Sequence, residues 1–273
     1  MTKILSGSEI AEFIKERQAR QVRALRQADH VAPTLAIVKA TDSSPVIEAY
    51  VRMKQRYAAD ILIDTVIETV DDNDMPAVLE KLSSDPSIHG IIVQLPLTDP
   101  TKTDEIVNLI APSKDVDGLG KDAAFDSATA EAINWLLVGY GVELKTKKIV
   151  IIGNGRLVGA PLYKIWQSGG YNVTIVGRDD DLKASLVSAD IIVTATGSAG
   201  LLTSDMVAIG AVVVDAGTAS EDGVIVGDVD QSVRAREDLT ITPEKGGVGP
   251  LTITALFDHV IRAATESAKT TLD

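Results

Sequence analysis

The chain contains no cysteine, and aromatic side chains make up only 4% of its 273 residues. Without cysteine the protein cannot use disulfide bonds, a thiolate nucleophile or a cysteine-ligated zinc site. This composition fits a reducing compartment, so we expect a cytoplasmic protein. The three histidines, His30, His89 and His259, are scattered without the spacing of metal ligands. We therefore predict that the protein binds no metal.

Positive charge is also in short supply. Lys and Arg together number 26 against 39 Asp and Glu, which gives a formal net charge of −13. Such an acidic balance disfavours nucleic acid or an anionic membrane surface as the main partner. No apolar run approaches the length needed to cross a bilayer, and the first residues lack the apolar core of a signal peptide. We therefore predict that neither nucleic acid nor a membrane is a partner.

Helical and strand-like segments alternate along nearly the whole chain, which is typical of α/β proteins with parallel sheets. Helices are expected at residues 8–28, 47–59, 76–82, 103–110, 126–138 and 251–269. Strands are expected at residues 34–38, 61–67, 90–97, 148–152, 173–176, 190–194, 211–214 and 223–226. The pattern predicts two α/β domains, made of residues 1–122 plus 250–273 and residues 123–249. A cleft between two such domains is a common place for ligands.

A glycine cluster follows the apolar run Ile149–Ile152 and precedes a helical pattern. Its members are Gly153, Gly155 and Gly159. Glycine lets the backbone turn tightly and approach a phosphate, and the N-terminus of the next helix supplies free N–H donors and a positive dipole end. The spacing is one residue longer than the usual dinucleotide fingerprint. We interpret the cluster as a dinucleotide-binding turn, and an ordinary strand-to-helix loop is the alternative.

The end of the second strand of such a domain meets the adenosine ribose of the dinucleotide. Here the strand 173–176 runs into Gly177, Arg178 and the acids Asp179–Asp181. A guanidinium gains charge-assisted hydrogen bonds with the 2′-phosphate of NADP that the hydroxyl of NAD does not offer. We therefore favour NADP, with NAD possible. The alternative is that Arg178 pairs on the surface with the neighbouring acids.

Tyr50 and Lys54 are the informative residues of the first half. They are four residues apart and share one face of the expected helix 47–59. An aromatic ring beside an amine suits a planar ligand whose reacting centre lies near its edge, although such a pair is often only a solvated helix face. Gln94 stands at the carboxyl end of a strand, where open α/β sheets place ligand-binding residues, and Asp117 follows in a polar turn.

Six motifs occur together in the order of one known family. They are Tyr50–Lys54, Val93–Leu97, Lys114–Gly118, Gly210–Gly217, Gly227–Asp230 and Gly246–Thr252. On these motifs the chain resembles, nearly end to end, the bifunctional methylenetetrahydrofolate dehydrogenase/cyclohydrolase family. The resemblance implies a folate domain built from the N-terminal part and the last helix, with a Rossmann-like NAD(P)-binding domain between them. It also implies tetrahydrofolate derivatives as substrates, NADP as cofactor and a homodimer.

The same resemblance implies a reaction and a set of site residues. 5,10-Methylenetetrahydrofolate is oxidised to the methenyl form, which water then opens to 10-formyltetrahydrofolate. Tyr50 is expected to stack on the folate and Lys54 to be the catalytic amine, with Gln94 as its partner and Asp117 gripping the pterin edge. Further substrate-binding positions are Leu95, Pro96, Gly247 and Pro250. The expected cofactor-binding residues are Gly153, Asn154, Gly155, Arg156, Val158, Gly159, Arg178, Thr196, Gly197 and Thr218.

Several segments depart from the family pattern, including the stretch 41–49, the shortened segment after Gly118, and three that bear on the expected sites. Gly153–Gly155 stands where the family has Gly-Arg-Ser, and Val176–Arg178 where it has Cys-His-Ser. We expect Arg178 to replace the missing arginine. The family's Pro-Cys-Thr-Pro loop is absent, and Phe125–Ala130 takes its place. Three functions therefore stay open: the bifunctional enzyme, a cyclohydrolase alone, and a non-catalytic module that binds folate or nucleotide. The presence of both Tyr50 and Lys54 favours an enzyme.

Overall fold

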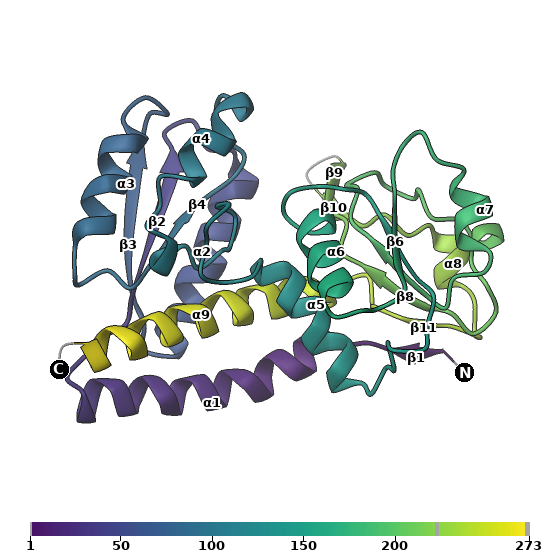
Figure 1. Ribbon diagram of the computed structural model, residues 1–273, viewed down its shortest axis with the longest axis horizontal. Coiled ribbons are helices and arrows are strands. Elements are labelled where there is room, and N and C mark those ends of the chain that lie inside the picture. The colour runs from purple at the N-terminus through teal and green to yellow at the C-terminus, as the bar shows by residue number, and fades with distance from the viewer. Residues whose placement is uncertain (1, 222–223, 271–273) are drawn as a thin grey trace. The chain divides into compact units, whose positions relative to one another are not determined.

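The computed structural model describes residues 2–221 and 224–270, and the chain divides into two compact units (Figure 1). Unit 1 consists of Met1–Ala11 and Thr129–Thr252, and unit 2 of Glu12–Ala128 and Ile253–Asp273. Each unit has a parallel sheet with helices packed against it. The predicted α/β class with two parallel-sheet units is therefore confirmed.

Unit 2 contains a three-stranded sheet. Its strands have the order β3-β2-β4 and are all parallel, with Val38 of β2 paired to Val93 of β4. The parallel arrangement places the carboxyl ends of all three strands at one edge of the sheet. The elements of this unit are α1 (Gly7–Ala28, which begins in unit 1), β2 (Thr34–Ala40), α2 (Pro45–Asp60), β3 (Asp64–Val70), α3 (Met75–Ser84), β4 (Gly90–Val93), η1 (Pro100–Lys102), α4 (Thr103–Val107), η2 (Pro112–Lys114) and α9 (Val248–Thr270, which also begins in unit 1).

Helix α2, which carries the candidate amine, is fixed at its start and along its length. Ser44 caps the helix by accepting a hydrogen bond from the Ile47 N–H, and Pro45 stands at its first turn, where no backbone donor is needed. Further along, the Tyr57 hydroxyl donates to Gln18 Oε1 at 2.7 Å, and the Tyr57 ring stacks on Phe257 with centroids 5.2 Å apart. These contacts tie α2 to α1 and α9.

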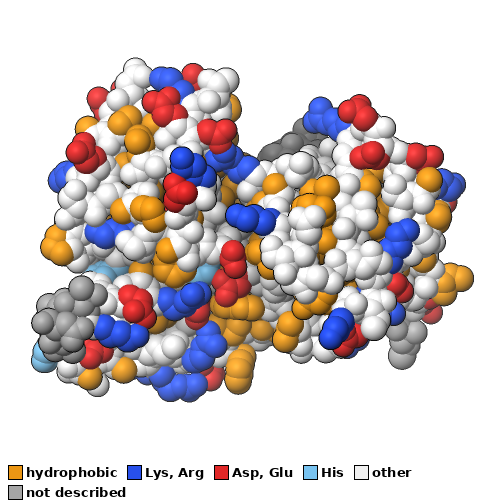
Figure 2. All heavy atoms as spheres, viewed as in Figure 1, with side chains coloured by type: hydrophobic (Ala, Val, Ile, Leu, Met, Phe, Trp, Pro, Cys, Tyr) orange, Lys and Arg blue, Asp and Glu red, His pale blue; other side chains and the backbone are white. Residues whose placement is uncertain are grey.

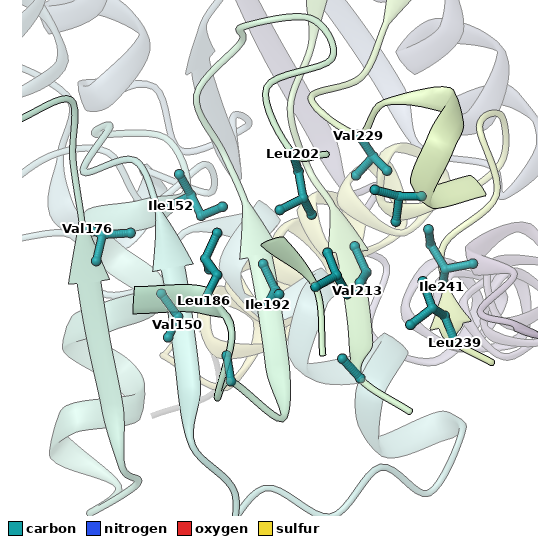
Figure 3. Packing of buried hydrophobic residues seen from close by; sticks show 14 residues of the cluster. Val150, Ile152, Val176, Leu186, Ile192, Leu202, Val213, Val229, Leu239 and Ile241 are labelled. Carbon is teal, nitrogen blue, oxygen red and sulfur yellow. The ribbon is translucent and has the colours of Figure 1, made fainter. Parts of the chain in front are cut away.

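Unit 1 contains a six-stranded sheet of order β1-β11-β8-β7-β5-β6, in which every pair is parallel. Its elements are β1 (Lys3–Ile4), α5 (Ala128–Gly139), β5 (Ile149–Ile152), α6 (Gly159–Ser168), β6 (Val173–Val176), α7 (Leu182–Leu186), β7 (Ile191–Thr194), η3 (Ser204–Met206), β8 (Val212–Asp215), β9 (Ala219–Glu221), β10 (Val224–Val226), α8 (Gln231–Arg234) and β11 (Thr240–Ile241). Apolar side chains from the strands, including Ile152, Ile192 and Val213, pack into one buried cluster (Figure 3).

The order of these strands creates a switch point at β5. The chain passes from β5 through α6 to β6 on one side, whereas β7 pairs with β5 on the other side. In open α/β sheets, ligands bind outside the carboxyl ends of the strands at such a point. The glycine cluster beginning at Gly153 follows β5 directly and therefore lies where this rule expects a ligand.

Several element boundaries differ from the sequence-based expectation. Residues 1–11 were expected in the same domain as residues 12–122, but β1 pairs with β11 and joins the sheet of unit 1. The strand expected from residue 61 begins at Asp64, because Ile61 ends α2 and Leu62 has a φ of 66°. β10 pairs antiparallel with β9 rather than entering the parallel sheet. Residue 223, the expected start of that strand, lies outside the described residues.

Acidic and basic side chains are interspersed on the face shown in Figure 2. Among residues 2–221 and 224–270, no helix combines the length and the apolar character that a bilayer crossing requires.

Candidate active site and cofactor-binding loops

The structure brings Lys54 and Gln94 together in unit 2. Lys54 Nζ donates a hydrogen bond to Gln94 Oε1 at 2.6 Å. Gln94 follows β4 immediately, and its backbone N–H donates to the Val38 carbonyl at 2.8 Å, which extends the ladder by one residue. The amine of α2 is thus held at the carboxyl end of the sheet. Tyr50 lies one turn earlier on the same helix and is half-buried.

Asp117 lies in a turn whose backbone is hydrogen-bonded to a second carboxylate, that of Asp115. The buried Asp115 accepts hydrogen bonds from the backbone N–H groups of three successive residues, Gly118, Leu119 and Gly120, at 3.0, 3.2 and 2.7 Å. Gly118 has a φ of +68°, a conformation that L side chains rarely adopt. The backbone on the carboxyl side of Asp117 is therefore fixed.

Electrostatics links the amine and the carboxylate. Burial lowers the pKa of Lys54, and the nearby charge of Asp117 opposes this shift. Burial raises the pKa of Asp117, and the nearby Lys54 and His259 side chains oppose that shift. Burial also raises the pKa of Tyr50, so its phenol stays neutral. Lys54, Gln94 and Asp117 thus form one cluster that contains a hydrogen-bonded amine with an increased tendency to lose its proton.

The other expected substrate-binding residues fall in two places. Leu95 and Pro96 follow Gln94 directly; Leu95 is half-buried against the apolar cluster beneath α3, and Pro96 is exposed. Gly247 and Pro250 lie in unit 1, around the start of α9. A Cβ atom at Gly7 would lie 1.9 Å from the Gly247 carbonyl oxygen, so these two backbones are in direct contact.

The glycine turn after β5 packs closely against the start of α6. Gly153 has a φ of +99°, and a Cβ atom at Gly159 would lie 1.8 Å from the Gly153 carbonyl oxygen. α6 therefore starts directly against the turn. A Cβ atom at Gly155 would have only one neighbour within 4 Å, at 3.9 Å, which leaves open space beside the start of α6. The residues present fit a dinucleotide whose phosphates lie at this helix N-terminus.

The loop after β7, which contains the expected cofactor residues Thr196 and Gly197, is held by a residue that the sequence reasoning missed. Asp228 is fully buried. Its carboxylate accepts hydrogen bonds from the Thr196 N–H at 2.7 Å, the Thr196 hydroxyl at 2.9 Å and the Ser198 N–H at 2.9 Å. Burial raises the pKa of Asp228, and the bonds from Thr196 oppose this shift.

Asp228 is coupled to a second missed carboxylate, Asp215 at the end of β8. Asp215 accepts from the Asp228 N–H at 3.1 Å and pairs with Arg234 Nη2 at 2.7 Å. A Cβ atom at Gly217 would lie 2.1 Å from Asp228 Cγ, and one at Gly227 would lie 2.1 Å from Asp215 Oδ2. Each carboxylate thus packs against the glycine beside the other. Thr218, another expected cofactor residue, follows Gly217 and is exposed. The sequence carried a local sign of both carboxylates, because Asp215 directly follows an apolar run and Asp228 follows Gly227 at the end of another.

The turn after β6 leaves one arginine exposed. Asp180 accepts a hydrogen bond from the Gly177 N–H at 2.7 Å, and Asp181 caps α7 by accepting from the Ala184 N–H at 3.0 Å. These two acids therefore interact with the backbone of their own turn. Within the described part of the chain, Arg178 forms no ion pair with the neighbouring acids, which was the alternative role considered for it. Arg156 and Val158, in the turn after β5, are half-buried, and Asn154 is exposed.

A parallel sheet with a glycine turn at its switch point, together with a second α/β unit that carries polar residues at its strand ends, is typical of two-domain nucleotide-dependent dehydrogenases. Comparison with known families specifies the class. Residues 5–117 match the catalytic domain of tetrahydrofolate dehydrogenase/cyclohydrolase, and residues 127–268 match its NAD(P)-binding domain. The chain therefore belongs to the tetrahydrofolate dehydrogenase/cyclohydrolase family, and the resemblance seen in the sequence is confirmed.

Individual relatives agree over almost the whole chain. The bifunctional protein FolD of Lactobacillus acidophilus is 37% identical over 276 residues, covering 96% of this chain and 97% of that protein. The crystal structure of the bifunctional FolD dehydrogenase/cyclohydrolase from Campylobacter jejuni has a TM-score of 0.91 at 32% identity, covering 97% and 99% of the two chains. The Trypanosoma brucei FolD structure, complexed with NADP cofactor and inhibitor, has a TM-score of 0.90 at 26% identity, covering 97% and 98%.

Proposed function

We propose that this protein oxidises 5,10-methylenetetrahydrofolate to 5,10-methenyltetrahydrofolate with NADP and hydrolyses the product to 10-formyltetrahydrofolate. The observation that carries the proposal is the Lys54–Gln94 hydrogen bond beside Asp117 in a chain of this family. A protein that only binds folate needs no amine with a lowered pKa at that place. A homodimer and a cytoplasmic location, expected from the resemblance and the composition, are part of the same proposal.

The folate site is proposed to orient the substrate through the edge and the plane of its pterin ring. The Asp117 carboxylate accepts two N–H donors from the guanidine-like edge of the pterin, which is a bidentate, charge-assisted arrangement. The Tyr50 ring stacks against the pterin plane. The carbon to be oxidised and then hydrolysed is thereby placed near Lys54, one helical turn from Tyr50.

Lys54 is proposed to move the proton during hydrolysis. Burial lowers the pKa of its amine and so favours loss of the amine's proton; in its deprotonated form the amine takes a proton from the water that attacks the methenyl carbon. The C–N bond to the ring nitrogen then breaks as the same proton returns from Lys54 to that nitrogen, and the formyl C=O forms with release of the intermediate's hydroxyl proton to solvent. Gln94 accepts an N–H of the amine and aligns it without adding charge. A full positive charge on Lys54 would disfavour binding of the methenyl cation. The lowered pKa therefore favours substrate binding as well as proton transfer.

NADP, when bound, supplies the hydride acceptor for the first reaction. In unit 1 the turn at Gly153 and the N-terminus of α6 are proposed to hold its pyrophosphate, with Arg178 at the 2′-phosphate. Thr196, Gly197 and Thr218 lie in loops at the carboxyl ends of β7 and β8 and are proposed to position the rest of the cofactor.

A single pair of assays separates the three functions that the sequence left open. Methylenetetrahydrofolate is supplied with NADP or with NAD, and the methenyl chromophore is followed as it forms. In the second assay, methenyltetrahydrofolate is supplied and its decay is followed. Formation reports the dehydrogenase, and enzyme-dependent decay reports the cyclohydrolase. A protein that shows neither, but still binds folate or nucleotide, is the non-catalytic module, and the proposal fails.

Replacing Arg178 with alanine is expected to raise the KM for NADP by about 10- to 100-fold, because a charge-assisted hydrogen bond contributes about 1.5–3 kcal/mol. The KM for NAD should stay within about twofold, since NAD has no 2′-phosphate. Steady-state dehydrogenase rates with each cofactor give both values. Lys164→Ala, an exposed residue of α6, is the matched control and should change neither. Equal loss with the two cofactors would remove Arg178 from NADP recognition.

The rate of methenyltetrahydrofolate hydrolysis is expected to rise with pH. Only the neutral amine accepts a proton, so activity is lost as pH falls through the pKa of Lys54. Burial places that pKa below the ordinary value of 10.5. The test is a pH–rate profile of kcat for the wild-type protein, corrected for uncatalysed hydrolysis. A rate that falls as pH rises toward the ordinary lysine pKa of 10.5 would contradict the role of Lys54 as a base.

A further inference from the structure

His259 lies next to the folate site but has no role in the proposed chemistry. It belongs to α9, and its side chain is fully buried in unit 2. His259 Nδ1 lies 2.8 Å from the carbonyl oxygen of Val116, the residue directly before Asp117. Because a carbonyl oxygen only accepts, the proton of this hydrogen bond is on Nδ1. The histidine therefore holds the turn at the peptide that leads into the Asp117 carboxylate.

Phe125 holds the histidine ring in place. The two rings stack with centroids 4.8 Å apart and an interplanar angle of 23°. The guanidinium of Arg262, one turn further along α9, lies 5.2 Å from the Phe125 centroid and makes a cation–π contact. Phe125 is the first residue of the segment that takes the place of the family's Pro-Cys-Thr-Pro loop.

The Phe125 segment also contacts the Asp117 turn itself. A Cβ atom at Gly118 would lie 2.3 Å from the Asp126 carbonyl oxygen, so the segment packs directly on Gly118. In addition, the Ala128 N–H donates to the Asp117 carbonyl at 3.3 Å. Asp117 is thus held from three directions: by Asp115 from inside the turn, by His259 at the preceding peptide, and by the replacement segment.

Charge adds to these contacts. Burial raises the pKa of Asp117, which favours the neutral carboxyl, and the nearby Lys54 and His259 side chains act in the opposite direction. A carboxylate that must accept two N–H donors from a substrate has to be ionised. His259 is therefore placed where its hydrogen bond to Val116 contributes to the orientation of Asp117.

We propose that His259, fixed by its stack with Phe125, is a positioning residue for the reduced pteridine of the substrate. It keeps the Val116–Gly118 turn in the conformation that presents the Asp117 carboxylate to the N–H donors of the ring. The identity of the ligand rests on the proposed function, whereas the link from His259 to the turn rests on the contacts alone. The effect on catalysis is indirect, so we expect it in substrate binding rather than in the chemical step.

The test compares His259→Leu with His259→Asn. Leucine removes the hydrogen bond to Val116, whereas the amide N–H of asparagine replaces the Nδ1–H at nearly the same distance from the backbone. We expect His259→Leu to raise the KM for methenyltetrahydrofolate about 10-fold, which corresponds to about 1.4 kcal/mol and is the scale of one lost hydrogen bond, and to leave kcat within about threefold. His259→Asn should return KM to within about threefold of the wild-type value. Phe125→Leu, which removes only the stack, should raise KM by a smaller factor.

Three results would overturn the inference: an unchanged KM in His259→Leu, an equal rise of KM in the leucine and asparagine variants, or a loss confined to kcat. If His259→Leu does not fold, the other two variants replace it. The inference then requires KM to rise in Phe125→Leu and to stay within about threefold of the wild-type value in His259→Asn. Calorimetric titration with 5-formyltetrahydrofolate separates this inference from the proposed function. A wild-type protein that binds this folate without hydrolysing the methenyl form contradicts the function, and the Kd values of the variants then test His259. A wild-type protein that binds no folate refutes both.

Discussion

Replacing Lys54 with alanine is expected to lower the rate of methenyltetrahydrofolate hydrolysis by about 10²–10⁴-fold, which is the usual contribution of a positioned general acid–base group. The amine is hydrogen-bonded to Gln94 at 2.6 Å, and its pKa is lowered by burial, so its removal deprives the site of its proton acceptor. The measurement is the enzyme-dependent decay of the methenyl chromophore under single-turnover conditions, where product release does not limit the rate.

The matched control for this variant is Lys81→Ala, which removes an exposed lysine at the end of α3 in the same unit. We expect it to leave the rate of hydrolysis unchanged. Binding of 5-formyltetrahydrofolate to the Lys54→Ala protein should persist, because Tyr50 and Asp117 remain. A hydrolysis rate within a factor of three of wild type would remove Lys54 from the mechanism.

Asp228→Asn is expected to separate the two activities. The carboxylate accepts three hydrogen bonds from the Thr196–Ser198 loop, whereas an asparagine amide has one acceptor oxygen and places N–H donors against donors. Each buried donor left without a partner costs about 1–3 kcal/mol. We expect kcat/KM for the NADP-dependent oxidation to fall about 100-fold. Hydrolysis of methenyltetrahydrofolate should stay within about threefold, because Lys54, Gln94 and Asp117 lie in unit 2.

Two measurements accompany the Asp228→Asn assay. The free energy of unfolding should fall by about 2–4 kcal/mol from the unpaired donors. Direct titration with NADP should show weaker binding by the folded protein. Asp205→Asn, an exposed acid of the same unit whose partner is Lys183, is the control and should retain both activities. Parallel loss of oxidation and hydrolysis in the Asp228 variant would mean a general loss of structure and would contradict the positioning role.

The sequence predicted the larger elements of the fold because their residue patterns extend over enough residues to be recognised. The helix expected at residues 8–28 is α1 (Gly7–Ala28), and the strand at residues 173–176 is β6. Two-residue strands carry no such pattern, so β1 and β11 were not expected. The pairing of these two strands moves residues 1–11 into unit 1. Strand pairing between segments far apart in the chain is decided by packing, not by local preference.

The residues of the candidate site likewise fall into those that local sequence patterns indicate and those that only distant contacts reveal. Tyr50 and Lys54 are visible from helical spacing, and Gln94 from its place at the end of a strand. Asp228 stands in the quoted Gly227–Asp230 motif, but its role, like that of His259, follows only from contacts with residues 32 and 143 positions away. The role of each sequence-derived site residue stays a prediction that the assays above test.

The division of α9 between the two units has a consequence for how the protein is made. This helix begins in unit 1, yet it supplies Phe257, His259 and Val260 to the interior of unit 2. During translation the strands of unit 2 leave the ribosome early, but the helix that covers them leaves after all the strands of unit 1. The apolar surface of unit 2 therefore stays exposed through most of synthesis. We expect nascent chains to depend on chaperones until α9 has emerged.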